Sequence, residues 1–152
     1  MTTNSSMSGN SITRMAFVIL GGLLISACSV NLSERRPGLS EEEAIKALLI
    51  AYQQAWNKHD ESELSPLLDE GFVIWRWMDG KRKLVATKGS YVFWLRDLFV
   101  RYRYLTFGTP DIWLEDHGAT VFVPLTLDAR GFRGTFRVIQ RGGKWLIQEF
   151  EF

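Results

Sequence analysis

The feature that most constrains this chain is residues 40–60, SEEEAIKALLIAYQQAWNKHD, in which apolar residues recur at helical spacing. They form one wide stripe: Ile45, Leu48, Leu49, Tyr52 and Trp56. Ser40 and Glu43 have the spacing of a capping box, and the acidic residues beside them favour the positive end of a helix. Because the stripe ends in two large aromatic side chains, it predicts a concave surface that closes over the helix.

The next part of the chain predicts a short helix, a hairpin and a longer helix. A capping box at Asp60 opens the short helix. Residues 72–77 are apolar on both faces apart from one arginine and predict a covered strand. This strand turns at residues 79–80 into a return strand at 84–86. Residues 91–99 predict the longer helix.

From Arg101 onward, alternating apolar and polar residues predict a run of antiparallel strands. A bend is expected at residues 108–110. Pro124 predicts an irregularity or a sheet edge, because proline has no N–H to donate. Turns are expected at residues 116–118, 130–131 and 141–143. The order of elements predicts an α+β domain over residues 40–152, with helices packed on one side of a strongly curved antiparallel sheet.

The first 27 residues differ from the rest, since Arg14 is their only charged residue. The apolar run at residues 15–27 is about two thirds as long as the ~20 residues that a membrane-spanning helix needs. It has the length of a signal-peptide core, so residues 1–27 are predicted to be a signal peptide. Either Met1 or Met7 could be the start of translation.

Residues 25–28, ISAC, resemble the lipobox of bacterial lipoproteins. The resemblance implies cleavage before Cys28, a diacylglyceryl group on its thiol and a further acyl chain on the new amino terminus. Two or three acyl chains make a stable membrane anchor. Residues 28–39 would then be the lipidated cysteine and a polar tether. The alternative is a secretory leader followed by a domain with a buried free cysteine.

The lipobox resemblance also implies a location. The chain would be anchored in the cell membrane or the outer membrane, with its domain in the periplasm or outside the cell. Ser29 favours the outer membrane under the sorting habit of enterobacterial lipoproteins.

The domain itself resembles the NTF2-like superfamily, a cone-shaped α+β fold that ketosteroid isomerases and SnoaL-type cyclases share. The resemblance is carried by residues 51–60 (AYQQAWNKHD), residues 67–72 (LLDEGF), Lys88-Gly89 at a helix start, and residues 142–147 (GGKWLI). It implies the fold of residues 40–152 but not one function, because the superfamily holds enzymes, binding modules and assembly domains.

The resemblance to ketosteroid isomerases can be followed residue by residue. Tyr52 and Asp60 have the spacing of those enzymes' helix tyrosine and loop acid, so Tyr52 resembles the oxyanion-hole donor. The place of the catalytic base falls on Arg76, which stays protonated and cannot abstract a proton at neutral pH. The place of the buried acid falls on Gly134. We therefore expect a non-catalytic domain; the alternative is a SnoaL-type isomerase, cyclase or dehydratase that uses Tyr52 with an acid elsewhere.

The candidate pocket residues are mostly aromatic: Tyr52, Trp56, Trp75, Arg76, Trp94 and Tyr104. Such side chains line pockets for aromatic or lipid-like ligands, and they equally fill a core or a dimer face. Arg76 would hold a ligand anion or, in the favoured interpretation, pair with Asp60 or Asp97. Arg133 and Arg137 alternate along one strand and are expected on a solvated face with Glu149 and Glu151.

The remaining observations exclude some classes of function. The net charge of +1 gives no support to nucleic-acid binding. His59 and His117 have no partner at metal-ligand spacing, and no Gly-rich phosphate loop is present, so no metal or cofactor is expected. We expect a membrane-anchored protein that binds a small apolar ligand or docks onto an envelope protein. A homodimer through the sheet is the remaining alternative.

Overall fold

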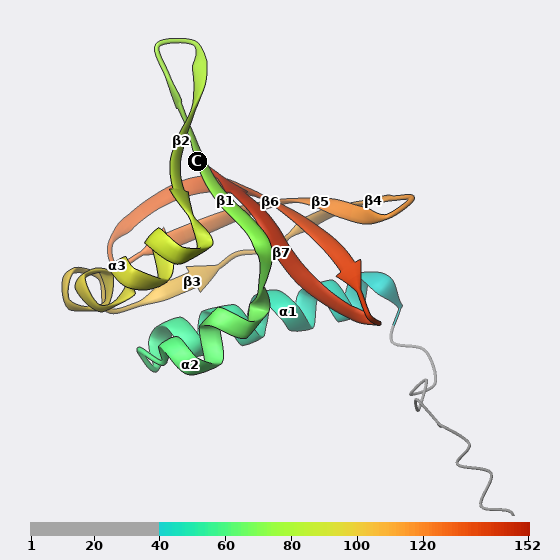
Figure 1. Ribbon diagram of the computed structural model, residues 1–152, viewed down its shortest axis with the longest axis horizontal. Helices are drawn as coiled ribbons and strands as arrows, with labels where there is room; N and C mark the ends of the chain where they lie inside the picture. The colour runs from blue at the N-terminus through green and yellow to red at the C-terminus, as the bar shows by residue number, and fades with distance from the viewer. Residues whose placement is uncertain (1–39) are drawn as a thin grey trace, which may run out of the picture. The chain divides into compact units, whose positions relative to one another are not determined.

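The computed structural model describes residues 40–152. The elements occur in the following order: α1 Glu41–Asn57, α2 Glu61–Leu64, the 3-10 helix η1 Ser65–Leu67, β1 Leu68–Met78, β2 Lys81–Thr87, α3 Lys88–Arg101, β3 Leu105–Phe107, β4 Asp111–Glu115, β5 Gly118–Leu127, β6 Arg130–Arg141 and β7 Lys144–Glu151. The helices lie on one side of a curved sheet (Figure 1). The expected signal peptide, Cys28 and tether lie outside the described residues.

Helix α1 has the boundaries that its sequence predicts, because both ends are capped. The side chains of Ser40 and Glu43 each accept the other residue's backbone N–H, which completes the capping box. At the other end His59 takes a left-handed conformation (φ 57°). Its N–H donates to the Trp56 carbonyl (2.8 Å), and the Asp60 N–H donates to the Ala55 carbonyl (2.9 Å). This Schellman motif stops the helix just before α2.

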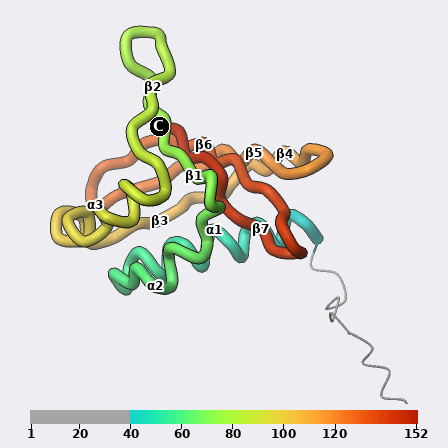
Figure 2. The backbone as a smooth tube through the Cα atoms, in the orientation of Figure 1, coloured from blue at the N-terminus to red at the C-terminus, as the bar shows by residue number. Residues whose placement is uncertain are grey.

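Strands β1 and β2 form a hairpin that is longer than expected and extends beyond the rest of the domain (Figure 2). Its turn is at Asp79 and Gly80, as predicted, with left-handed backbone at both residues (φ 54° and 68°). Thr87 then caps α3, since its N–H donates to Ser90 Oγ at 2.9 Å. Helix α3 therefore starts three residues earlier than residues 91–99 suggested.

All seven strands form one sheet in the order β2-β1-β7-β6-β5-β3, with β4 also paired to β5. Every pair is antiparallel except β1 and β7, which are parallel, with Val73 opposite Glu149 and Ile74 opposite Phe150. The expectation of an entirely antiparallel sheet is wrong at this pair. These are the first and last strands of the domain, so no tight turn fixes their relative direction.

The break at residues 108–110 lies where the sequence predicts it. Strand β3 pairs with residues 125–127 of β5, and β4 pairs with residues 118–122. Pro124 lies between the two segments, and its carbonyl accepts the Gly108 N–H at 2.7 Å. The irregularity predicted at Pro124 is confirmed.

Two local expectations are wrong. Residues 102–104 are not a strand, because Arg101 ends α3 and β3 starts only at Leu105. The turn expected at residues 130–131 lies at Asp128 and Ala129 instead. Both differences involve Asp128, whose carboxylate accepts the backbone N–H groups of Arg103 and Tyr104 at 3.0 Å each. A side chain thus takes the donors that a strand would have used.

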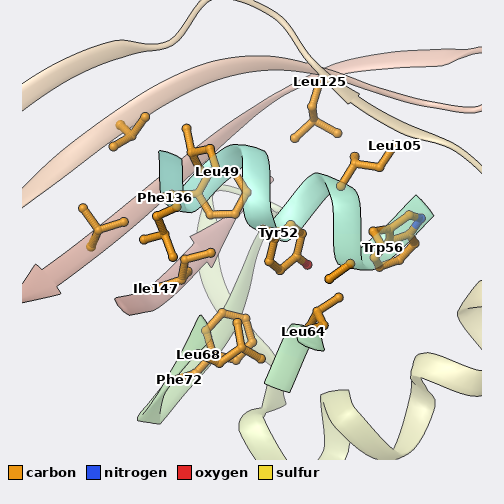
Figure 3. Packing of buried hydrophobic residues seen from close by; sticks show 14 of the residues in the cluster. Leu49, Tyr52, Trp56, Leu64, Leu68, Phe72, Leu105, Leu125, Phe136 and Ile147 are labelled. Carbon is orange, nitrogen blue, oxygen red and sulfur yellow. The ribbon is translucent and has the colours of Figure 1, made fainter. Parts of the chain in front are cut away.

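The core lies between α1 and the inner face of the sheet (Figure 3). Leu49, Tyr52 and Trp56 of α1 lie among side chains from distant parts of the sheet, including Leu125 and Phe136 (Figure 3). The stripe read from the sequence is therefore the buried face of the helix, as predicted.

Replacing Gly118 with alanine should destabilise the fold. A Cβ there would lie well inside van der Waals contact with the Val138 carbonyl oxygen, which is backbone and cannot turn away. We expect a loss of about 1–3 kcal/mol in urea denaturation, the usual cost of overpacking. Gly89→Ala is the control, because a Cβ at Gly89 meets nothing within 4 Å. Equal stability of the two variants would contradict the close packing of β5 on β6.

Candidate ligand-binding cavity

A cavity of about 690 Å³ lies between the helices and the inner face of the sheet. The helices contribute five lining residues: Tyr52, Trp56, Tyr91, Trp94 and Leu98. The strands β1, β2, β3, β5, β6 and β7 provide most of the remaining wall. Its volume is within the range of small-molecule sites, and most of its lining is aromatic or aliphatic.

Two buried tyrosines supply the polar groups on the helical wall. The hydroxyls of Tyr52 on α1 and Tyr91 on α3 are hydrogen-bonded to each other. Burial raises the pKa of Tyr52 to about 12, with the Tyr91 hydrogen bond acting in the opposite direction. Burial also raises the pKa of Tyr91 well above its ordinary value. Both hydroxyls are therefore protonated at neutral pH, and one O–H of the pair remains free to donate.

A continuous series of aromatic contacts crosses the cavity wall. The Tyr52 ring lies 6.2 Å from that of Phe136, which is stacked 4.6 Å from Phe150. Phe150 is in turn stacked 5.5 Å from Phe152. All four side chains line the cavity, so its surface is aromatic from the tyrosine pair to the end of β7.

Three arginines line the same cavity: Arg76 on β1, and Arg130 and Arg133 on β6. All three side chains are exposed. The Arg76 guanidinium lies 5.7 Å from the centre of the Phe152 ring. The favoured expectation that Arg76 pairs with Asp60 or Asp97 is wrong. Asp60 instead caps α2, where its carboxylate accepts the Glu63 N–H and the Ser62 hydroxyl.

The other candidate residues are divided between the cavity and other positions. Tyr52, Trp56, Arg76 and Trp94 line the cavity, whereas Trp75 and Tyr104 do not. Trp75 belongs to β1 as Arg76 does, but successive residues of a strand point to opposite faces. It lies under the Arg82 guanidinium, 4.4 Å from the ring centre. Tyr104 is 65% exposed, because it belongs to the loop that Asp128 fixes.

The outer face of the sheet is also only partly as predicted. Glu149 and Glu151 lie on it and are ion-paired with Arg82, and Arg137 is paired with Glu115. Arg133 also lines the cavity, although the register of β6 pairs it with the exposed Pro124 and so keeps it on the face of Arg137. Trp77, Trp113 and Phe122 are exposed. The homodimer through the sheet stays a prediction.

The positions that carry catalytic acids in ketosteroid isomerases are occupied differently here. Arg76 replaces the base. Gly134 is buried, and a Cβ there would lie 2.7 Å from side-chain atoms of both Leu125 and Phe150, so these side chains would have to move to admit a carboxylate. Within residues 40–152 no carboxylate lines the cavity. The one buried carboxylate of this region, Asp69, is bonded to Arg141 at 2.9 Å and to the Gly71 N–H.

Other types of site can be checked in the part of the chain that the structure describes. There, no three His, Cys, Asp or Glu side chains are placed to hold a metal ion. His59 is stacked 5.1 Å from Phe99, and its Nε2 lies 3.3 Å from the Arg103 carbonyl. No helix in residues 40–152 is both long enough and apolar enough to span a membrane.

Comparisons with solved structures identify the fold. Residues 40–152 have the NTF2-like fold, also called cystatin-like. An NTF2-like protein from Cytophaga hutchinsonii matches with a TM-score of 0.63 and 14% identity, over 74% of this chain and 97% of that one. An NTF2-like protein of unknown function from Shewanella baltica matches with a TM-score of 0.60 and 17% identity, over 73% and 90%. A cystatin-like protein of unknown function from Nostoc punctiforme has a TM-score of 0.58 and 10% identity, over 72% and 87%.

These identities are low, so the likeness establishes the fold alone. No protein-family profile and no curated protein sequence matches the chain.

Several lining residues were missed by sequence reasoning. Tyr91 was assigned to a helix without a role, and only the fold brings it to Tyr52, 39 positions away. Arg130 was assigned to a turn, and Arg133 to the outer face. Alternation along the strand placed Arg133 on one face with Arg137, in agreement with the register of β6, but it gave no sign that Arg133 also lines the cavity.

The tyrosine pair should behave as one energetic unit. Tyr52→Phe or Tyr91→Phe alone leaves the other hydroxyl buried without its partner, so each should lose about 1–2 kcal/mol of unfolding free energy. The double variant should lose little more than either single one, because both polar groups are gone. Urea denaturation of the four proteins measures this coupling. Tyr104→Phe, at an exposed position, is the control, and strictly additive losses would disprove the coupling.

Proposed function

We propose that this protein is a membrane-anchored lipoprotein whose NTF2-like domain binds a small, largely apolar ligand without transforming it. The observation that carries the proposal is the cavity of about 690 Å³, whose wall is mainly aromatic and aliphatic. A ligand with rings or an alkyl chain would bury apolar surface there, and ~25 cal/mol per Å² is gained from such burial.

The polar groups of the cavity support binding rather than acid–base catalysis. The Tyr52 and Tyr91 hydroxyls are bonded to each other and protonated, so together they can donate a hydrogen bond. Among the described residues, no carboxylate faces them. Proton abstraction needs a base within hydrogen-bond reach of the substrate, and arginine cannot serve as one at neutral pH. This arrangement favours the binding function over the SnoaL-type enzyme.

The membrane anchor rests on the sequence. The apolar run at residues 15–27 is followed by the lipobox-like ISAC and the chain's single cysteine. A lipid on Cys28 would leave the domain on the outer side of a bacterial membrane, joined by the polar tether. A carrier held beside a membrane suits a ligand of this kind, because an apolar ligand is poorly soluble in water.

A neutral fluorescent probe tests the binding function. N-phenyl-1-naphthylamine should become fluorescent with purified residues 28–152 and raise the melting temperature. At ten times the dissociation constant the added stability is about 1.4 kcal/mol. Leu98→Glu places a charge on the cavity wall and should weaken binding about tenfold or more, since burying a charge is costly.

Val100→Glu is the matched control for this experiment. It lies on the same helix, adds the same charge and is 82% exposed. It should bind the probe as the unmodified protein does. Absence of probe binding to the unmodified protein, or equal binding by the two variants, would contradict a ligand site in this cavity.

The anchor is tested separately by metabolic labelling. Cells that express the full chain should incorporate radioactive palmitate into it, and the protein should sediment with membranes. Cys28→Ser should abolish the label, whereas Ser29→Ala, next to the acylated position, should keep it. Equal labelling of the Cys28→Ser variant and the unmodified chain would reject lipidation at Cys28.

A further inference from the structure

The charges on the cavity wall all have one sign. Arg76, Arg130 and Arg133 are the ionised side chains among its lining residues, and no lining carboxylate of residues 40–152 offsets them. Arg76 is in β1 and the other two are in β6, strands that β7 separates in the sheet. The fold therefore brings three positive charges from distant parts of the chain to one apolar cavity. Low-dielectric walls strengthen the field that such charges produce.

These three arginines differ from the cations on the outer face. Arg82 is ion-paired with Glu149 and Glu151, and Arg137 with Glu115. For Arg76, Arg130 and Arg133, no carboxylate within the described part of the chain lies within the 4 Å that defines an ion pair elsewhere in it. Their guanidinium groups are exposed and available to a partner from outside the domain.

The aromatic series connects this charge to the tyrosine pair. The Arg76 guanidinium lies over Phe152, and Phe152 is followed by Phe150, Phe136 and Tyr52. The cavity surface is thus positive at Arg76 beside Phe152, aromatic from Phe152 to Phe136, and able to donate a hydrogen bond at the tyrosine pair. A ligand with an anionic group at the end of an apolar body would match all three parts.

We propose that the cavity selects an amphipathic acid, a molecule with one carboxylate, sulfonate or phosphate group on an apolar body. This proposal rests on the proposed ligand-binding function and names the chemical class of its ligand. Arg130 and Arg133, with Arg76, hold the anionic group, because a guanidinium presents two parallel N–H donors to such oxygens. The apolar body lies along Phe152, Phe150 and Phe136 toward Tyr52.

Two probes that share one apolar body test this selection. 8-Anilinonaphthalene-1-sulfonate carries a sulfonate on the anilinonaphthalene body, and N-phenyl-1-naphthylamine is the same body without it. The protein of residues 28–152 should bind the sulfonate at least about tenfold more tightly, as expected when charge-assisted hydrogen bonds are added. Raising the salt concentration should weaken sulfonate binding only.

The variant Arg130→Gln/Arg133→Gln should lose this preference, with sulfonate affinity falling about tenfold or more and neutral-probe affinity unchanged. Arg101→Gln/Arg103→Gln is the matched control, since it removes the same charge from residues that do not line the cavity. Melting temperatures of both variants are measured first, so that affinities are compared between folded proteins.

Displacement of the sulfonate probe by other compounds distinguishes acids with an alkyl chain from acids with a ring system. Dodecanoate and naphthalene-2-carboxylate should displace the sulfonate probe, and dodecanol and 2-naphthalenemethanol should do so at least about tenfold less well. The ligand body is a flexible chain if dodecanoate displaces the probe at the lower concentration, and a ring system if naphthalene-2-carboxylate does.

Each outcome decides one of the two proposals. The selection of acids would be overturned if the protein bound the two probes equally. It would also be overturned if the Arg101→Gln/Arg103→Gln control lost as much sulfonate affinity as the Arg130→Gln/Arg133→Gln variant. In both cases the apolar binding function would still stand. Binding of neither probe would overturn the binding function itself. Preference for the acid that disappears only in the cavity variant supports both.

Discussion

The packing of α1 against the inner face of the curved sheet is the constraint on which the rest of this domain depends. Along its first half the contact is filled, and Ile45 and Leu49 are buried without reaching the cavity. Along its second half Tyr52 and Trp56 are equally buried but line a cavity. One amphipathic helix is therefore part of the packed core at one end and part of the cavity wall at the other.

The fold supplies a cavity, and a few lining residues decide its chemistry. The inner face of this sheet carries an arginine and a glycine at the two positions that the resemblance to ketosteroid isomerases assigns to catalytic acids. At Gly134 the packing favours glycine, because side-chain atoms of Leu125 and Phe150 lie 2.7 Å from the place of a Cβ. At Arg76 the exchange reverses the charge.

The distribution of ion pairs separates the two faces of the sheet. On the outer face glutamates neutralise Arg82 and Arg137, which gives a solvated surface. Arg76, on the inner face, has no described ion-pair partner and lies instead over the Phe152 ring. Leaving cations near an apolar wall costs solvation energy, and a bound anion would recover part of it. This difference is why the cavity, and not the outer face, is the better candidate for a ligand.

What the sequence determined by itself is what depends on neighbours within a few positions: helix α1 with its capping box, the hairpin turns at residues 79–80 and 142–143, and the break opposite Pro124. From residues 15–28 it also predicted the anchor at Cys28, which lies outside the described residues and stays a prediction. Only the tertiary structure decided the parallel pairing of β1 with β7, the meeting of Tyr52 with Tyr91, and the positions of Arg130 and Arg133 beside the cavity. Caps and turns are stabilised by local hydrogen bonds, whereas strand register and twist are set by contacts between segments that are far apart in the chain.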